Sequence, residues 1–136
     1  MKIIYQNSEG GVSVTHPTGE LSIEEVAAKD VPEGVAYEIV EDDAIPSDRT
    51  FRAAWVYSPD GIEIDLDRAK AIGHDIRRRR RADELAPHDR VISLKIPGAS
   101  ADQAEAARAA IRERYSIMQT AIDAAKTVDA IHAALN

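Results

Sequence analysis

The stretch LDRAKAIGHDIRRRRRADEL at residues 66–85 decides the fold class of this chain. Its apolar residues fall three or four positions apart, which is the spacing of one face of an α-helix. They are Leu66, Ala69, Ile72 and Ile76. The pattern predicts a long helix that begins at Leu66, continues through the arginines to Leu85 and is stopped by Pro87.

A second helical pattern follows a loop that we predict at residues 87–98. Ser100 and Gln103 have the spacing of a capping box at a helix N-terminus. The apolar residues that follow step by three and four positions, as in a seam between paired helices. They are Ala104, Ala107, Ile111, Tyr115, Met118, Ile122 and Ala125. The two long helices are expected to form an antiparallel hairpin, and Thr127 to cap a short last helix ending at Leu135.

Residues 1–65 have a different pattern, in which short β-branched runs alternate with turn residues. The runs Lys2–Gln6 and Val12–Thr15 flank a turn that contains two glycines, which predicts a β-hairpin. Further strands are predicted at residues 35–40, 50–57 and 62–65, and the turn SPDG at residues 58–61 joins the last two.

One short helix interrupts these strands. Ser22 and Glu25 form a capping box, which predicts a helix at residues 23–29. The expected fold class is therefore α+β. A small β-rich head at residues 1–65, with Phe51 and Trp55 in its core, is followed by an antiparallel helical hairpin at residues 66–136.

Composition excludes several classes of site. The chain has no cysteine, which rules out disulfide scaffolds, thiolate zinc sites and cysteine nucleophiles. Aromatic residues make up only 4% of the chain and alanine is abundant, so the core should be thin. Neither a signal peptide nor a membrane-spanning run is recognisable, and we expect a soluble protein of a reducing cytoplasm.

The two halves differ in charge. Residues 1–65 hold 4 Lys and Arg against 14 Asp and Glu, a net charge of −10, whereas residues 66–136 hold 13 against 10, a net charge of +3. This surplus is far below that of a typical DNA-binding domain, so nucleic acid is not the expected partner.

No arrangement of catalytic or metal-binding residues stands out. His16, His74, His88 and His132 are widely separated, and the glycine-rich motifs of nucleotide binding and of serine hydrolases are missing. Glu63 and Asp65 would share one face of a strand, but neither a nucleophile nor a further base accompanies them. The prediction is a protein without catalytic activity, metal or cofactor.

Five consecutive arginines, at residues 77–81, are the most unusual local feature. Because successive helical residues are about 100° apart, the run covers all sides of a helix and must place at least one arginine near the seam. Three interpretations remain open: a solvated stretch that counters the acidic head, a contact with a protein partner, and nucleic-acid binding, which the lack of interleaved aromatic residues disfavours.

Several segments resemble small proteins encoded in phage and prophage tail gene clusters. They are DVPEG at residues 30–34, YEIV at 37–40, IPSDRTFRAAW at 45–55 and DLDRAKAIGHDIR at 65–77. The string P-x-D-R-T-F-R-x-A-W is the most specific of them. The chain is thus similar to tail and tail-fibre assembly chaperone-like proteins, a resemblance that implies binding of a tail protein and no catalytic residue.

From this resemblance we expect a phage tail or tail-fibre accessory protein in the cytoplasm of a bacterial host. The candidate partner-binding residues are Arg77, Arg80, Ile111, Tyr115, Met118 and Ile122, together with the outer face of the helices. Because an alanine-rich seam buries little area, the hairpin needs a further partner, which is its own head, a second copy of the chain or a client. Two alternatives stay open: a structural component retained in the virion tail, and an inhibitor of a host defence protein that acts through its acidic surface.

Overall fold

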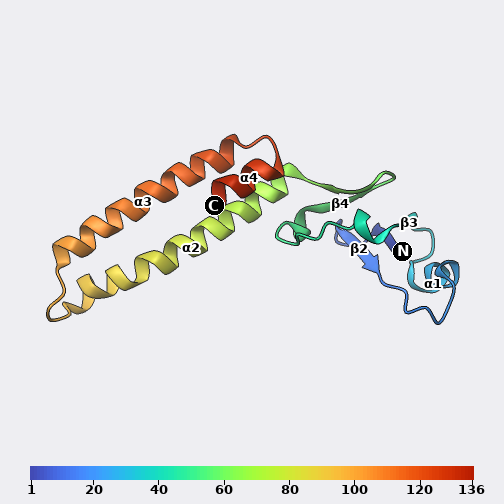
Figure 1. Cartoon of the computed structure of the whole chain (residues 1–136), viewed down its shortest axis with the longest axis horizontal. Coiled ribbons are helices and arrows are strands. Elements are labelled where there is room, and N and C mark those ends of the chain that lie inside the picture. Colours follow the sequence, from blue (N-terminus) through green and yellow to red (C-terminus); the bar gives the residue numbers. More distant parts are fainter. The chain divides into compact units, whose positions relative to one another are not determined.

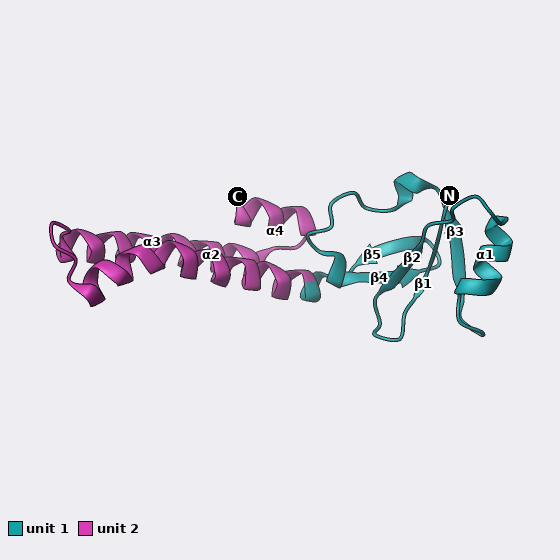
Figure 2. Ribbon diagram, turned by 90° about the horizontal axis from the view of Figure 1, so that it is seen from below, with its two compact units in different colours: residues 1–68 teal, residues 69–136 magenta.

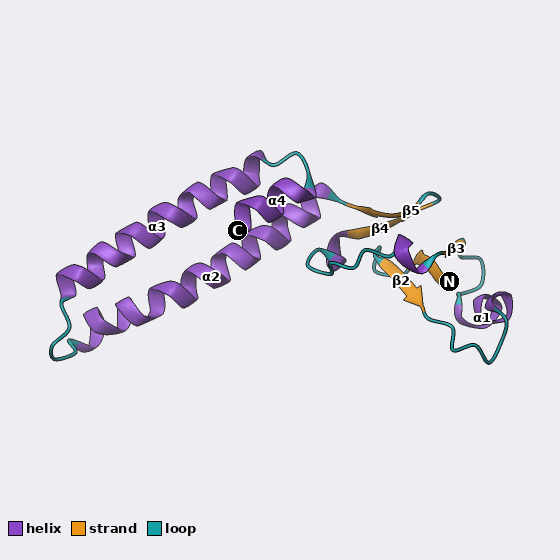
Figure 3. Ribbon diagram, in the orientation of Figure 1, coloured by secondary structure: helices purple, strands orange, loops and turns teal.

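The computed structural model describes residues 1–136 and divides into two compact units, residues 1–68 and 69–136 (Figure 2). Unit 1 contains antiparallel strands and one short α-helix joined by turns and loops, and packed helices make up unit 2 (Figure 3). The predicted α+β fold class is confirmed.

Strand β1 (Lys2–Gln6) is the centre of a three-stranded antiparallel sheet with the order β2-β1-β3 (Figure 2). It forms the predicted hairpin with β2 (Val12–Thr15). In the turn, Oδ1 of Asn7 accepts a hydrogen bond from the backbone N–H of Gly11 at 2.9 Å. Gly10 has a φ of 78°, a conformation that glycine adopts without strain. Strand β3 (Tyr37–Val40) pairs with the other edge of β1 and is shorter than predicted.

Ile3 and Ile4 bury the two faces of this sheet. Successive side chains of a strand point to opposite faces, and both isoleucines are completely buried. Ile3 packs with Ala27, which belongs to helix α1 (Ile23–Asp30). Ile4 packs on the other face with Trp55. The central strand thus contributes to both apolar clusters of unit 1.

Helix α1 begins at the predicted capping box. Oγ of Ser22 accepts from the backbone N–H of Glu25 at 3.3 Å, and Oε2 of Glu25 accepts from the N–H of Ser22 at 2.8 Å. The hydrogen bonds from Ser22 hold the pKa of Glu25 below its ordinary value, because they stabilise the ionised carboxylate.

The strand predicted at residues 50–57 is wrong in its first half. Residues Arg52–Ala54 form a 3-10 turn, and strand β4 covers only Trp55–Ser58 before it turns back into β5 (Gly61–Ile64). The cause is local, because Oδ1 of Asp48 accepts from both the N–H and the hydroxyl of Thr50, at 2.9 and 2.7 Å, and starts a turn there. Phe51 and Trp55 are both buried, as predicted.

The first long helix continues past the residue that was expected to stop it. Helix α2 spans Leu66–Leu94 and contains Pro87. The predicted loop at residues 87–98 is therefore wrong for residues 87–94, which belong to α2, and the connection to helix α3 (Ala101–Ala124) covers only residues 95–100. Val91 and Ile92 are half-buried beyond the proline, and their burial offsets the backbone hydrogen bond that proline cannot donate.

Unit 2 is the predicted antiparallel hairpin of α2 and α3, with helix α4 (Val128–Leu135) turned back against it (Figure 1). The predicted caps are present, since the hydroxyl of Ser100 accepts from the N–H of Gln103 and that of Thr127 accepts from the N–H of Ala130. The α3 cap is one-sided, because only the serine bond of the expected capping box is formed.

Gly73 lets α4 come close to α2. A Cβ atom built on Gly73 would lie 2.9 Å from Cγ2 of Ile131 on α4 and 3.6 Å from Cγ2 of Ile122 on α3. Both isoleucines are completely buried, so neither can move aside without disturbing its neighbours. The three helices therefore meet at a position where only glycine fits.

Replacing Gly73 by leucine should lower the free energy of unfolding by about 2 to 3 kcal/mol, because the new side chain overpacks this contact. Leucine at Ala71, which is exposed on the same helix, is the matched control and should change it by less than about 0.5 kcal/mol. Urea unfolding followed by circular dichroism measures both. Equal effects of the two substitutions would contradict the close contact.

Pro87→Ala tests the continuity of α2. Alanine restores the backbone N–H that can bond to the carbonyl of Asp83, so we expect stability to rise by about 1 to 3 kcal/mol. Pro59→Ala, in the β4–β5 turn, should instead lower stability by about 0.5 to 1 kcal/mol, because proline restricts the unfolded chain there. Thermal unfolding distinguishes the two, and a loss of stability in Pro87→Ala would mean that α2 ends before the proline.

Candidate partner-binding surface

The structure places the predicted apolar binding residues on the inner face of α3. Ile111, Tyr115 and Ile122 are 9%, 3% and 0% exposed, and Met118 is half-buried. These side chains form part of the core of unit 2, so a closed hairpin offers little of their surface to another protein. Their role in partner binding stays a prediction, and it requires the hairpin to open.

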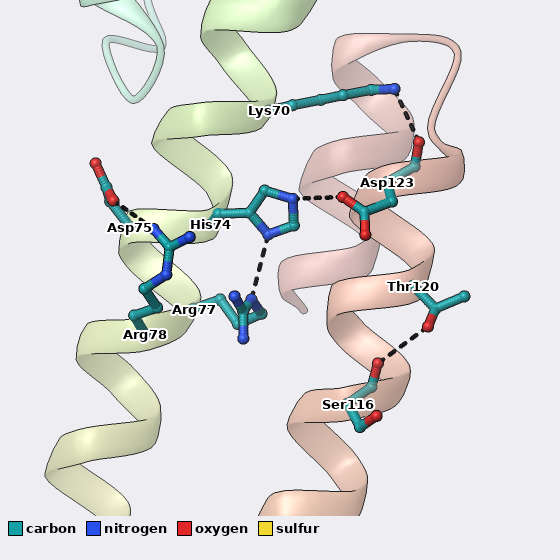
Figure 4. Close-up of polar contacts among 8 residues, drawn as sticks. All are labelled: Lys70, His74, Asp75, Arg77, Arg78, Ser116, Thr120 and Asp123. Carbon is teal, nitrogen blue, oxygen red and sulfur yellow. Dashed lines mark hydrogen bonds and ion pairs between the residues drawn. The ribbon is translucent and has the colours of Figure 1, made fainter.

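Arg77 lies inside unit 2, with only 3% of its surface exposed, which confirms that the arginine run reaches the seam. Nε of Arg77 donates to Nδ1 of His74 at 3.3 Å, and Nε2 of His74 lies 2.7 Å from Oδ1 of Asp123 (Figure 4). Because Nδ1 accepts, a neutral imidazole carries its proton on Nε2 and donates it to Asp123. Burial lowers the pKa of the Arg77 guanidinium, and the charges of Arg78 and Arg81 lower it further, against an opposing effect of Asp123.

Two further cations of α2 bind carbonyl groups at helix C-termini. Nζ of Lys70 donates to the backbone oxygen of Asp123 at 2.9 Å, near the end of α3 (Figure 4). Nη1 of Arg80 donates to the backbone oxygen of Leu135 at 2.5 Å, at the end of α4. The last carbonyls of a helix lack partners within the helix and carry its negative dipole end, so both contacts are favourable. Arg80, a predicted binding residue, thus holds α4 against α2.

Polar side chains also join α2 and α3 further along the hairpin. The hydroxyl of Tyr115 donates to Oε1 of Glu84 at 2.9 Å, and Arg114 pairs with the other oxygen of the same carboxylate. Nearer the connection, Nε of Arg108 lies 2.8 Å from Oδ1 of Asp89, at an angle unsuited to a hydrogen bond. This part of the seam depends on ion pairs as well as on apolar contact.

The outer face of α3 carries an exposed apolar surface. Ile117 is 63% exposed and lines a shallow hollow together with Ala121 and Ala124. Ser116 and Thr120 complete the lining, and the hydroxyl of Thr120 donates to the backbone oxygen of Ser116 instead of pointing to a partner (Figure 4). We call these five residues the α3 outer face. Covering a water-exposed isoleucine with a second apolar surface lowers the free energy of the system.

The sequence pattern alone does not single out the residues of the α3 outer face. Its signal is a second apolar line, because Ile117, Ala121 and Ala124 are spaced by four and three residues like the seam itself. The larger residues of the seam dominate the pattern and hide this line, in which only Ile117 is bulky.

No group of three or more histidine, aspartate and glutamate side chains lies close enough together to hold a metal ion. None of the helices combines the length and the apolar character needed to cross a membrane. Comparison with protein-family models, curated proteins and solved structures gives no match for this chain.

Substitutions of Arg77 test whether its charge or its volume matters to unit 2. A buried charge with a weak set of partners is replaceable by an apolar side chain of similar size, so Arg77→Leu should leave stability unchanged or raise it by about 1 to 2 kcal/mol. Arg77→Ala leaves a void and should lower stability by about 2 kcal/mol. Urea unfolding measures both. If Arg77→Leu lowers stability as much as Arg77→Ala, the hydrogen bond to His74 contributes more to stability than the volume of the side chain does.

Proposed function

We propose that this chain is a phage tail or tail-fibre accessory protein that binds another tail protein without catalysing a reaction. The resemblance of its segments at residues 30–77 to proteins of tail gene clusters supports the phage assignment. The exposure of Ile117 within the α3 outer face is the observation that carries the binding role. It provides an apolar contact outside the core of unit 2, as a protein interface requires.

The mechanism is assembly chaperoning. Fibre and tail proteins expose apolar surface and unpaired strand edges before they associate, and such surfaces aggregate. The α3 outer face covers apolar surface of the client in the cytoplasm of the bacterial host, until subunit association displaces it. A small, flat contact suits this role, because a client that must be released cannot be held by a large interface.

The acidic-surface alternative has less support. Glu41, Asp42 and Asp43 are all exposed at the start of a short 3-10 turn (Asp42–Ala44) that Glu41 precedes, as an inhibitor of a nucleic-acid-binding protein requires. Oδ1 of Asp42, however, lies 3.7 Å from Nζ of Lys2, which neutralises part of this charge. We therefore favour the apolar contact.

Co-expression with the tail protein encoded in the neighbouring reading frame tests the proposal. We expect the chain to raise the soluble, assembled fraction of that protein and to copurify with it before assembly. Ile117→Asp should weaken the complex at least about tenfold, because it places a charge in the centre of the contact. Isothermal titration with the purified partner measures this change.

Ala82→Asp is the matched control, because it adds the same charge at an exposed position of α2. It should leave binding within about twofold of the wild type. A tail protein that is equally soluble and assembled without the chain would refute chaperoning. Equal losses in the two variants would refute the α3 outer face, and a chain that stays in purified virions would favour a structural component of the tail.

A further inference from the structure

We propose that unit 1 binds a phosphoryl group in the concavity lined by Arg49, Arg52 and Arg68. This site, which we call the arginine concavity, also includes Asn7, Glu9 and Ser13 in its lining. All of these residues belong to residues 1–68, and the inference is independent of the tail-binding role of α3.

The charges of unit 1 are distributed unevenly. Residues 1–68 hold 5 Lys and Arg against 15 Asp and Glu, yet three of these five cations line one concavity. Glu9 is the only carboxylate in the lining. An acidic unit that gathers three of its arginines along one concavity has a local positive site for an anion.

The arginines come from two separate segments, and the structure fixes the position of each segment. The backbone N–H of Arg68 donates to Oδ1 of Asp65 at 2.8 Å, which caps the start of α2, and its Nη1 donates to the carbonyl of Gly10 at 3.3 Å. The guanidinium of Arg52 lies 5.2 Å from the centre of the Trp55 ring, over a completely buried side chain. Arg49 precedes the same turn.

Neutral donors complete the lining. Oδ1 of Asn7 accepts from the backbone N–H groups of Glu9 and Gly11, at 3.0 and 2.9 Å. The amide nitrogen of Asn7 is therefore left as a donor that forms no hydrogen bond within the chain, and the hydroxyl of Ser13 lies in the same lining. Guanidinium forks, an amide and a hydroxyl are the groups that bind phosphate oxygens in proteins.

The charges around the site favour a compact anion, and its size also leaves room for the group that carries the phosphoryl. Its volume of about 570 Å³ is in the range of sites for small ligands. The surplus of carboxylates elsewhere in unit 1 repels an extended polyanion, such as nucleic acid or an acidic peptide, but a single phosphoryl group fits within the positive region. A phosphate monoester carries nearly two negative charges and three acceptor oxygens. It therefore matches three arginines better than a ligand with a single carboxylate group does.

Titration of the full chain with inorganic phosphate, O-phosphoserine and adenosine monophosphate at low salt tests the proposal. Calorimetry should show saturable binding to one site. The fluorescence of Trp55, the single tryptophan of the chain, should follow the same curve, because Arg52 lies over its ring. Tighter binding of phosphoserine would identify a phosphorylated protein side chain as the source, and tighter binding of adenosine monophosphate a nucleotide. No saturable binding of any of the three would overturn the proposal.

Three single-charge variants decide whether the arginine concavity is the site. Arg49→Gln should weaken phosphate binding about tenfold, because it removes a charged donor. Lys29→Gln removes the same charge from unit 1 outside the concavity and should change binding less than about twofold. Glu9→Gln should tighten binding about threefold, because it removes the only carboxylate of the lining. Equal effects of Arg49→Gln and Lys29→Gln would show a non-specific charge effect and reject the site.

Discussion

The contact between Gly73 and Ile131 is the constraint on which unit 2 depends. The absence of a side chain on Gly73 brings α4 within van der Waals distance of the α2 backbone. This approach lets Ile122 and Ile131 fill a core that contains only one aromatic residue, Tyr115. It also brings the end of α4 to Arg80, whose guanidinium binds the carbonyl of Leu135. Close packing and hydrogen bonds to helix ends thus compensate for the small number of large apolar side chains in unit 2.

The same shortage explains why charged residues occupy the seam. Arg77 fills volume that an apolar residue would normally fill, and its hydrogen bond to His74 links it to Asp123 on α3. Further along the hairpin, Glu84 on α2 likewise accepts a hydrogen bond from the hydroxyl of Tyr115 on α3. Buried polar groups need partners, and a seam that contains them buries less apolar area than a purely apolar one. The exposed apolar residues that we propose as the partner-binding surface lie on the opposite side of α3.

Unit 1 is organised by a single central strand. Ile3 and Ile4 on adjacent positions of β1 bury both faces of a small sheet, so one strand organises helix α1 on one face and Trp55 on the other. The turn at Arg52–Ala54 directs the side chain of Trp55 into the core and leaves the guanidinium of Arg52 over the Trp55 ring. The local turn chemistry that ended the predicted strand early is therefore also what positions an arginine of the concavity.

The sequence by itself determined the α+β class, the β1–β2 hairpin, the caps at Ser22, Ser100 and Thr127, and the presence of two long helices, because periodicity and caps are local properties. Only the tertiary structure decided where those elements end and what their side chains contact. Contacts beyond Pro87 offset a local helix-breaking preference, so α2 continues. The burial of Arg77 and the exposure of Ile117 depend on how each helix is rotated about its axis against its neighbours. The spacing of apolar residues shows which residues share a face, but it does not fix that rotation. The arginine concavity joins segments distant in sequence, so no local pattern predicted it.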